Sequence, residues 1–236
     1  INNNPSNTYV IDYIESIIND LDDVINNENL PSLIENNSVY IGSFPPNTNN
    51  ASNNNGLGFD SLLNTTSGSN NTAIGFNSSQ NNTTGEYNNS IGALSLKFNT
   101  QGSRNVTIGN ASLYRNTTGS NNCAFGHASL YENKTGSNNI AIGREALRYN
   151  VNNNNTAVGF NSLQNNTNGN YNNSFGGFSL KYNTEGTRNI SMGYASLYRN
   201  TSGSSNSAFG HASLYGNETG NFNVAIGRDS LRNSVN

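Results

Sequence analysis

Two histidines carry the greatest potential for acid–base or metal chemistry, and their spacing argues against both uses. His127 and His211 are the only histidines among the 236 residues. They occupy the same position in two copies of a longer repeat. Stacked strands would hold them about five strand spacings apart, roughly 24 Å, which is too far for one metal ion. We therefore expect both to be exposed polar residues at corners of the fold.

The other reactive groups form no catalytic pattern. The acidic residues are scattered, and no Gly-Lys-Ser or Gly-Lys-Thr sequence follows the glycines as in a phosphate-binding loop. The glycine-aspartate nonapeptide of calcium-binding rolls is missing as well. A lone Cys123 excludes a disulfide within the chain and a zinc cluster of cysteines. The sequence thus predicts a protein that is not an enzyme and that needs no cofactor or metal.

One column of side chains is better suited to binding than to catalysis. It lies five residues after a recurrent glycine, and we call its cationic and tyrosine members the outward stripe: Lys97, Tyr114, Tyr131, Arg148, Lys181, Tyr198, Tyr215 and Arg232. Tyrosine and arginine are enriched in binding hot spots, and a repeated stripe would gain avidity from weak single contacts. The stripe is our candidate receptor-binding surface. The alternative is that these residues pack between subunits or shield the edge of the core.

A 17-residue repeat positions these residues. A glycine that follows a large apolar residue recurs at steps of 17, with a single step of 16, at positions 58, 75, 92, 109, 126, 143, 159, 176, 193, 210 and 227. Gly42 precedes the series by 16 and looks like a degenerate first member. We call each repeat a rung, because such periods are typical of stacked, solenoid-like folds.

Other columns keep step with the glycine and suggest how a rung folds. An isoleucine, phenylalanine or similar residue precedes it, and a leucine follows four later, as in Ile108 and Leu113. We expect two short strands and two corners per rung, with the Ile/Phe and Leu columns together forming a thin core. Asn71 and its successors should form a ladder at one corner. A second glycine, ten after the first, is replaced by Asn153 in the shortened rung.

A longer repeat overlies the short one. Residues 71–148 match residues 155–232 at an offset of 84, so a block of five rungs has been duplicated. We therefore assign residues 54–236 to one head built from rungs. Duplication lengthens a rod without disturbing its packing, which suits a spacer or multivalent surface better than a single catalytic pocket.

The amino-terminal segment has a different pattern. Val10, Ile14, Ile17, Leu21 and Val24 are spaced 4, 3, 4 and 3, as in the seam of a coiled coil. Isoleucines at 11, 18 and 25 widen the apolar face and favour three strands. We assign residues 1–30 to a trimeric coiled coil, with a single capping helix as the alternative. Residues 31–53 form a linker that contains the degenerate first rung.

Composition limits the partners. Only 32% of residues are apolar, 11% are charged, and 54 are asparagines. A net charge of −3 provides no basic field, so we expect no nucleic-acid partner. We see no membrane span and expect no direct membrane insertion.

The rungs resemble the heads of trimeric autotransporter adhesins, and similar repeats occur in tail and surface fibres of viruses. The matching segments are Asn71-Thr72-Ala73-Ile74-Gly75, Asn139-Ile140-Ala141-Ile142-Gly143 and Asn223-Val224-Ala225-Ile226-Gly227. The resemblance implies an all-β fold, a trimeric left-handed parallel β-roll, preceded by a short α-helical coiled coil. It further implies an extracellular homotrimer, on a virion or bacterial surface, that binds a glycan or protein receptor of a host.

A second hypothesis stays open from the sequence. The chain could be a single-chain β-solenoid with a carbohydrate-related activity or with ice binding. That fold would need an interior that one chain can fill. With about two large apolar residues in each 17, the sequence predicts that three chains fill the core more easily than one.

Overall fold

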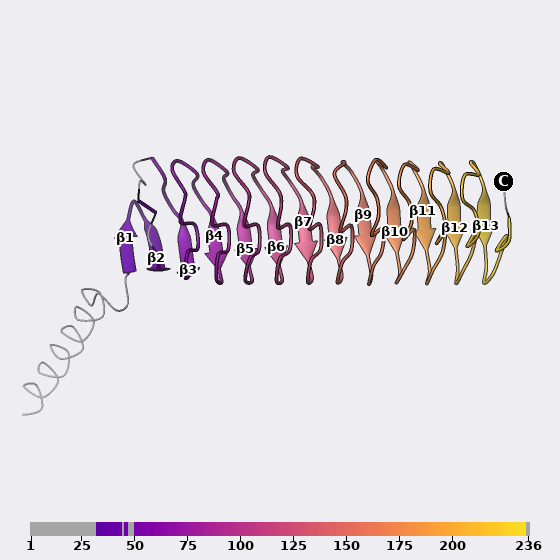
Figure 1. Cartoon of the computed structure of the whole chain (residues 1–236), viewed down its shortest axis with the longest axis horizontal. Coiled ribbons are helices and arrows are strands. Elements are labelled where there is room, and N and C mark those ends of the chain that lie inside the picture. The colour runs from indigo at the N-terminus through magenta and orange to yellow at the C-terminus, as the bar shows by residue number, and fades with distance from the viewer. Residues whose placement is uncertain (1–31, 44, 47–49, 235–236) are drawn as a thin grey trace, which may run out of the picture.

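The computed structural model describes residues 32–43, 45–46 and 50–234, and these form a straight rod of stacked rungs (Figure 1). The chain is an all-β parallel solenoid with one sheet, in which the 13 strands follow each other in chain order. The strands are β1 Ser32–Glu35, β2 Ser38–Gly42, β3 Asn55–Gly58, β4 Thr72–Ile74, β5 Asn89–Ile91, β6 Val106–Ile108, β7 Cys123–Phe125, β8 Ile140–Ile142, β9 Thr156–Val158, β10 Asn173–Phe175, β11 Ile190–Met192, β12 Ser207–Phe209 and β13 Val224–Ile226.

A hairpin begins the described part of the rod. β1 pairs antiparallel with β2 through Asn36 and Asn37, whose φ angles of 51° and 59° are those of a tight two-residue turn. β2 then pairs parallel with β3, with Gly42 opposite Gly58. Gly42 therefore occupies the same position in the sheet register as the glycine of the next rung. The predicted coiled coil in residues 1–30 lies outside the described residues.

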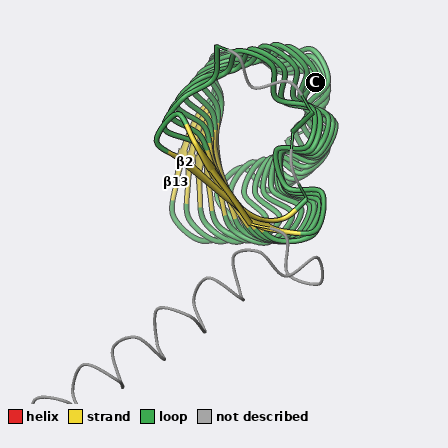
Figure 2. Cartoon of the chain, turned by 90° about the vertical axis from the view of Figure 1, so that its left-hand side faces the viewer, coloured by secondary structure: helices red, strands yellow, loops and turns green. Residues whose placement is uncertain are grey.

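Each rung contains one strand, so the prediction of a second strand around the leucine was wrong. Ala111 and Leu113 have φ angles of 53° and 50°. Left-handed residues at alternate positions coil the chain instead of extending it. Rungs still hydrogen-bond there, since the Leu113 amide donates to the carbonyl oxygen of Ser129 at 2.8 Å. In the end-on view the strands occupy one side of the cross-section and the connections close the rest (Figure 2).

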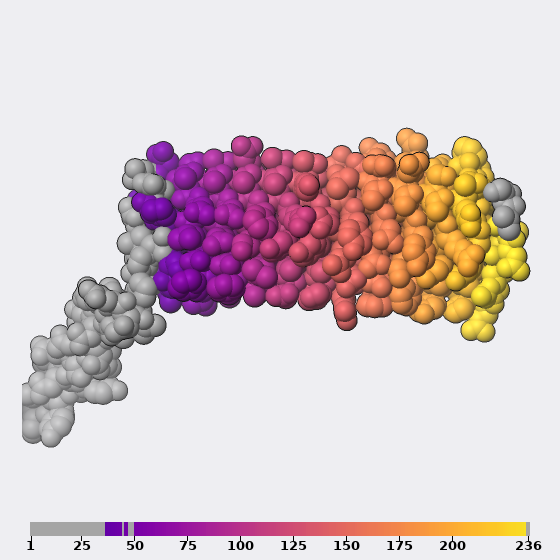
Figure 3. All heavy atoms as spheres, in the orientation of Figure 1, coloured from indigo at the N-terminus to yellow at the C-terminus, as the bar shows by residue number. Residues whose placement is uncertain are grey.

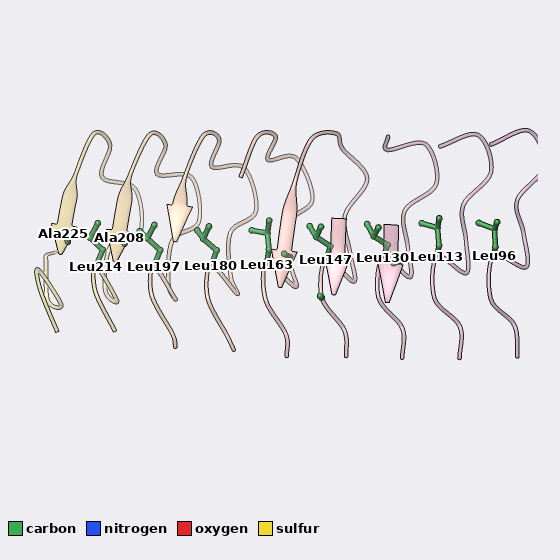
Figure 4. Packing of buried hydrophobic residues seen from close by; sticks show 14 residues of the cluster. Leu96, Leu113, Leu130, Leu147, Leu163, Leu180, Leu197, Ala208, Leu214 and Ala225 are labelled. Carbon is green, nitrogen blue, oxygen red and sulfur yellow. The ribbon is translucent and has the colours of Figure 1, made fainter. Parts of the chain in front are cut away.

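Of the two columns predicted to form the core, only one is buried. The leucine column is buried, as in Leu96 and Leu130 (Figure 4), but the Ile/Phe column lies on the outside, where Ile108 is 45% exposed. Strand side chains alternate, and the inward residue is the small one two before the glycine, such as Ser90. Its hydroxyl lies 2.7 Å from that of Ser78, an approach that leaves no room for a large side chain.

Asparagine ladders fill most of the remaining interior. The predicted ladder is confirmed: the Asn88 amide donates to the side-chain oxygen of Asn71 at 2.9 Å, while the Asn71 side chain donates to the carbonyl oxygen of Gly85 at 2.9 Å. A second ladder, seven residues after each glycine, was not predicted. It comprises Asn82, Asn99, Asn116, Asn133, Asn150, Asn166, Asn183, Asn200 and Asn217, all fully buried. One chain therefore fills its own interior with buried leucines and asparagines, so the filling of the core gives no reason to prefer three chains over one.

The shortened rung replaces its second glycine with Asn152, not with Asn153 as predicted. The carbonyl oxygen of Asn152 accepts from Asn139 at 2.7 Å, where other rungs use the glycine carbonyl. Asn153 instead accepts from the Ser137 amide through its side chain, at 2.7 Å, in the place of a serine. The missing residue therefore lies just before Asn152, and the ladders continue across the gap.

The described part of the chain contains no helix, and so none that could cross a membrane.

Candidate binding surfaces

The outward stripe lies outside the core, as the alternation beside the buried leucines predicted. Seven of its residues are half-buried, and Arg232 in the last rung is exposed. Rings within the stripe stack from rung to rung. The centroids of Tyr114 and Tyr131 are 4.9 Å apart at 13°, and the guanidinium of Arg148 lies 5.4 Å from the Tyr131 centroid. These contacts hold the side chains in an ordered column.

The second five-rung block repeats this arrangement. Tyr198 and Tyr215 stack with centroids 5.0 Å apart at 10°, and Arg232 lies 5.2 Å from the Tyr215 centroid. The structure therefore brings Tyr114, Tyr131 and Arg148 together in one cluster and their three counterparts in another.

Sequence reasoning missed the column next to the stripe, six residues after the glycine. Phe98 packs edge-on against Tyr114, with centroids 4.9 Å apart at 89°, and Tyr182 packs in the same way against Tyr198, at 5.0 Å and 90°. The same offset of 84 residues was the available signal. With Arg115 and Arg199, these rings extend the stripe sideways into a wider surface.

Two grooves lie on this surface. Groove A, of about 350 Å³, is lined by Phe98, Tyr114, Arg115, Thr117 and Lys134. Groove B, of about 610 Å³, is lined by Tyr182, Thr184, Tyr198, Arg199, Thr201 and Glu218. Every residue of groove A is matched in groove B by the residue 84 positions later. The duplication has therefore placed matching residues around two hollows on the side of the rod, whose overall outline is shown in Figure 3.

The outer side of the sheet is a second candidate surface, which we call the sheet face. In β3–β13 it comprises the first and third of the three residues that end just before each glycine, from Asn55 and Leu57 to Val224 and Ile226. None of these 22 residues is charged. Many are large and apolar, and Ile91, Ile142 and Met192 are each about two-fifths exposed. Parallel sheets normally have both faces covered, so this face has the character of an interface.

The histidines behave as the sequence predicted. His127 and His211 are both exposed, and His211 stacks on Tyr194 with centroids 5.6 Å apart. Within the described residues no group of three or more histidine, cysteine, aspartate or glutamate side chains is placed to hold a metal ion.

Threonine hydroxyls form an external ladder eight residues after the glycine. Thr83 donates to the carbonyl oxygen of Thr100 at 2.9 Å, and Thr100 donates to that of Thr117 at 3.0 Å. Because these hydroxyl protons are bound to backbone, the column is poorly suited to ordering water, which weakens the ice-binding hypothesis.

Among the residues that the structure describes, two titrating groups have shifted pKa values. A hydrogen bond with Tyr182, together with burial and neighbouring tyrosines, raises the pKa of Tyr198 to about 12. Burial raises the pKa of the Cys123 thiol on the sheet face.

Comparison with protein-family models, curated proteins and solved structures gives no match. The class is therefore defined by the fold itself: a parallel β-solenoid repeat protein with 17-residue rungs.

Proposed function

We propose that the chain is the rod-shaped head of a homotrimeric fibre, displayed on a virion or cell surface, which attaches to a glycan or protein of a host without catalysis. The sheet face carries this proposal. Its third-position residue is large and apolar in all 11 rungs from β3 to β13, none of its residues is charged, and it runs the length of the rod. Contiguous exposed apolar surface of this extent marks an interaction site.

A copy of the same chain is the occupant that fits best. An identical rod has the same length and the same rung spacing, so its sheet face can be covered along the whole sheet. Uncharged faces do not repel each other when they are brought together. The proposal that three chains associate rests on the isoleucine pattern of residues 8–28 and on the resemblance to trimeric fibre heads.

The grooves remain available in such a trimer. Tyr114 lies between β6 and β7, about halfway along the connection between the strands, and the connections form the sides of the cross-section away from the sheet (Figure 2). Association through the sheet would thus leave the tyrosine and arginine columns facing solvent in triplicate, where weak contacts add up.

Solution mass tests the proposal. We expect light scattering to give three times the 25.3 kDa chain mass, about 76 kDa. The double variant Phe175→Lys with Met192→Lys should yield a folded monomer, because buried unpaired charges at the seam are costly. Thr118→Lys, on an exposed turn, should stay trimeric. A wild-type monomer or dimer would overturn the trimer.

A further inference from the structure

The duplicated grooves differ in ways that the duplication alone does not explain. At equivalent positions groove A has Lys134 and groove B has Glu218. Beside groove A stands Glu132, whose carboxylate pairs with Arg115 at 3.2 Å. Its counterpart beside groove B is Gly216, which has no side chain to fill space, in keeping with the larger hollow.

From these differences we infer that the grooves are two saccharide subsites with different charge preferences. Groove A takes an anionic sugar, and groove B takes a neutral one. The inference deepens the proposed attachment function and rests on it for biological meaning, although the binding itself can be measured on the rod alone.

The wall chemistry favours a saccharide. Each groove has two perpendicular rings, from Phe98 and Tyr114 or from Tyr182 and Tyr198, on which the C–H faces of a pyranose can pack. Arginine donors and a threonine oxygen lie beside the rings and can bond sugar hydroxyls. A small apolar surface with a few placed polar groups is typical of a binding site that fixes ligand orientation.

The backbone around the grooves disfavours an extended peptide. The Arg115 amide already donates to the carbonyl oxygen of Tyr131 at 3.0 Å, and the Thr117 amide to that of Lys134 at 2.8 Å. A peptide strand would find no free ladder there to join. Recognition must come from side chains. Nucleic acid is disfavoured by the net charge of −3.

Charge separates the two subsites. In groove A the Arg115 guanidinium is balanced by Glu132, but no carboxylate of the described residues forms an ion pair with Lys134. Its ammonium is free to receive an anionic group of a sugar. In groove B, Arg199 and Glu218 form no ion pair with each other, but both line the hollow, so its lining has no net charge. Such a site offers donors and acceptors to neutral hydroxyls, and it repels an anion more than groove A does.

A matched pair of probes tests the inference on the full chain: a tetramer of galacturonic acid and the corresponding neutral tetramer of galactose, immobilised for binding measurements. We expect the rod to bind both. Tyr114→Ala should weaken mainly the acidic tetramer, and Tyr198→Ala mainly the neutral one. Lys134→Glu should weaken the acidic tetramer roughly tenfold, the usual effect of losing a hydrogen bond to a charged group, and change neutral binding less than about twofold.

Reciprocal and remote variants serve as controls. Glu218→Lys should make groove B resemble groove A and strengthen binding of the acidic tetramer. Arg228→Glu changes the chain by the same charge as Lys134→Glu at an exposed position and should change neither affinity. If Lys134→Glu and Arg228→Glu act alike, or if neither tetramer binds a rod of trimeric mass, the saccharide subsites are wrong while the fibre stands. Binding by a monomeric rod would support the subsites and overturn the trimer.

Discussion

Asn116 donates its side-chain amide to the side-chain oxygen of Asn99, one rung earlier, at 2.7 Å. The same amide donates to the carbonyl oxygen of Gly119 at 2.8 Å. Both asparagines are fully buried, so each amide satisfies a backbone group that has no access to water. Repeated in eight rungs, from Asn99 to Asn217, this pair of bonds replaces much of the apolar core that the composition lacks.

Substitution of Asn116 by aspartate should therefore destabilise the rod. A carboxylate cannot donate to Gly119 or to Asn99, and it would place a buried charge against two acceptor oxygens. We expect a loss of roughly 2–4 kcal/mol in unfolding free energy, measured by chemical denaturation. The control is Asn168→Asp, at an exposed position, which should cost under about 0.5 kcal/mol. Equal effects would show that the buried ladder contributes nothing special.

The sequence predicts those features of the fold that depend on the repeat itself, and fails for those that depend on how closely the side chains pack. The parallel stacking, the first rung at Gly42 and the ladder of Asn71 follow from the period, because identical side chains must lie above each other. The period did not predict which side chains of each strand point inward and which point outward. Hydrophobicity alone would place Ile108 inside. The inward side of the strand, however, lies so close to the opposite serine column that it admits only small residues such as Ala124. The repeat period of the sequence does not reveal how close these two columns are.

The binding surface divides in the same way. Alternation beside the buried leucine correctly placed Tyr114 and Tyr198 outside the core. It could not show that Phe98 and Tyr182 pack against them, since that contact depends on how the turn bends. Left-handed φ angles at Leu113 and its equivalents set this bend, and a leucine gives no sequence signal for them.

Two adjacent glycines allow a sharp test of the strand end. Gly176 has a φ of 129°, and a Cβ there would lie 2.5 Å from the carbonyl oxygen of Gly193. At Gly177 the nearest atom would be a ring carbon of Tyr194, at 3.5 Å, which is ordinary contact. Gly176→Ala should therefore cost roughly 2–4 kcal/mol in unfolding free energy through strain and overpacking. Gly177→Ala should be nearly neutral, and a reversed order in thermal unfolding would contradict this geometry.

Tyr198 in groove B has a shifted pKa, so its titration can be followed separately from that of the other tyrosines. Its pKa of about 12, against an ordinary 10.0, is due first to the hydrogen bond with Tyr182. The folded chain holds this proton more tightly than the unfolded chain, so the stabilisation is complete below pH 10 and is lost as the pH rises toward 12. Tyr182→Phe should lower the Tyr198 pKa toward 10, as read by NMR titration of ring-labelled tyrosine. Tyr171→Phe, at an exposed ring, should leave it unchanged.

The single thiol reports on the sheet face. Cys123 is the first residue of β7 and lies on the outer side of the sheet, in register between Val106 and Ile140. In one chain it is half-buried, and a neighbouring copy packed on the face would cover it further. We expect alkylation by iodoacetamide to be faster in the Phe175→Lys, Met192→Lys variant than in the wild type, because thiol reactivity rises with access to solvent. These substitutions lie in β10 and β11, far enough along the rod to leave the surroundings of the thiol intact.

Burial also raises the pKa of this thiol above its ordinary 9.0, so both rates should rise with pH as thiolate forms. The ratio of the two rates, measured at one pH, reports how accessible the thiol is to the reagent, separately from how much of it is ionised. A thiol moved to the exposed turn, Thr118→Cys in a Cys123→Ser chain, should react equally fast in the trimeric and charge-disrupted forms. If Cys123 itself reacts at the same rate in both, then no partner covers the sheet face, and the uncharged strip of isoleucine, valine and phenylalanine must be exposed for another reason.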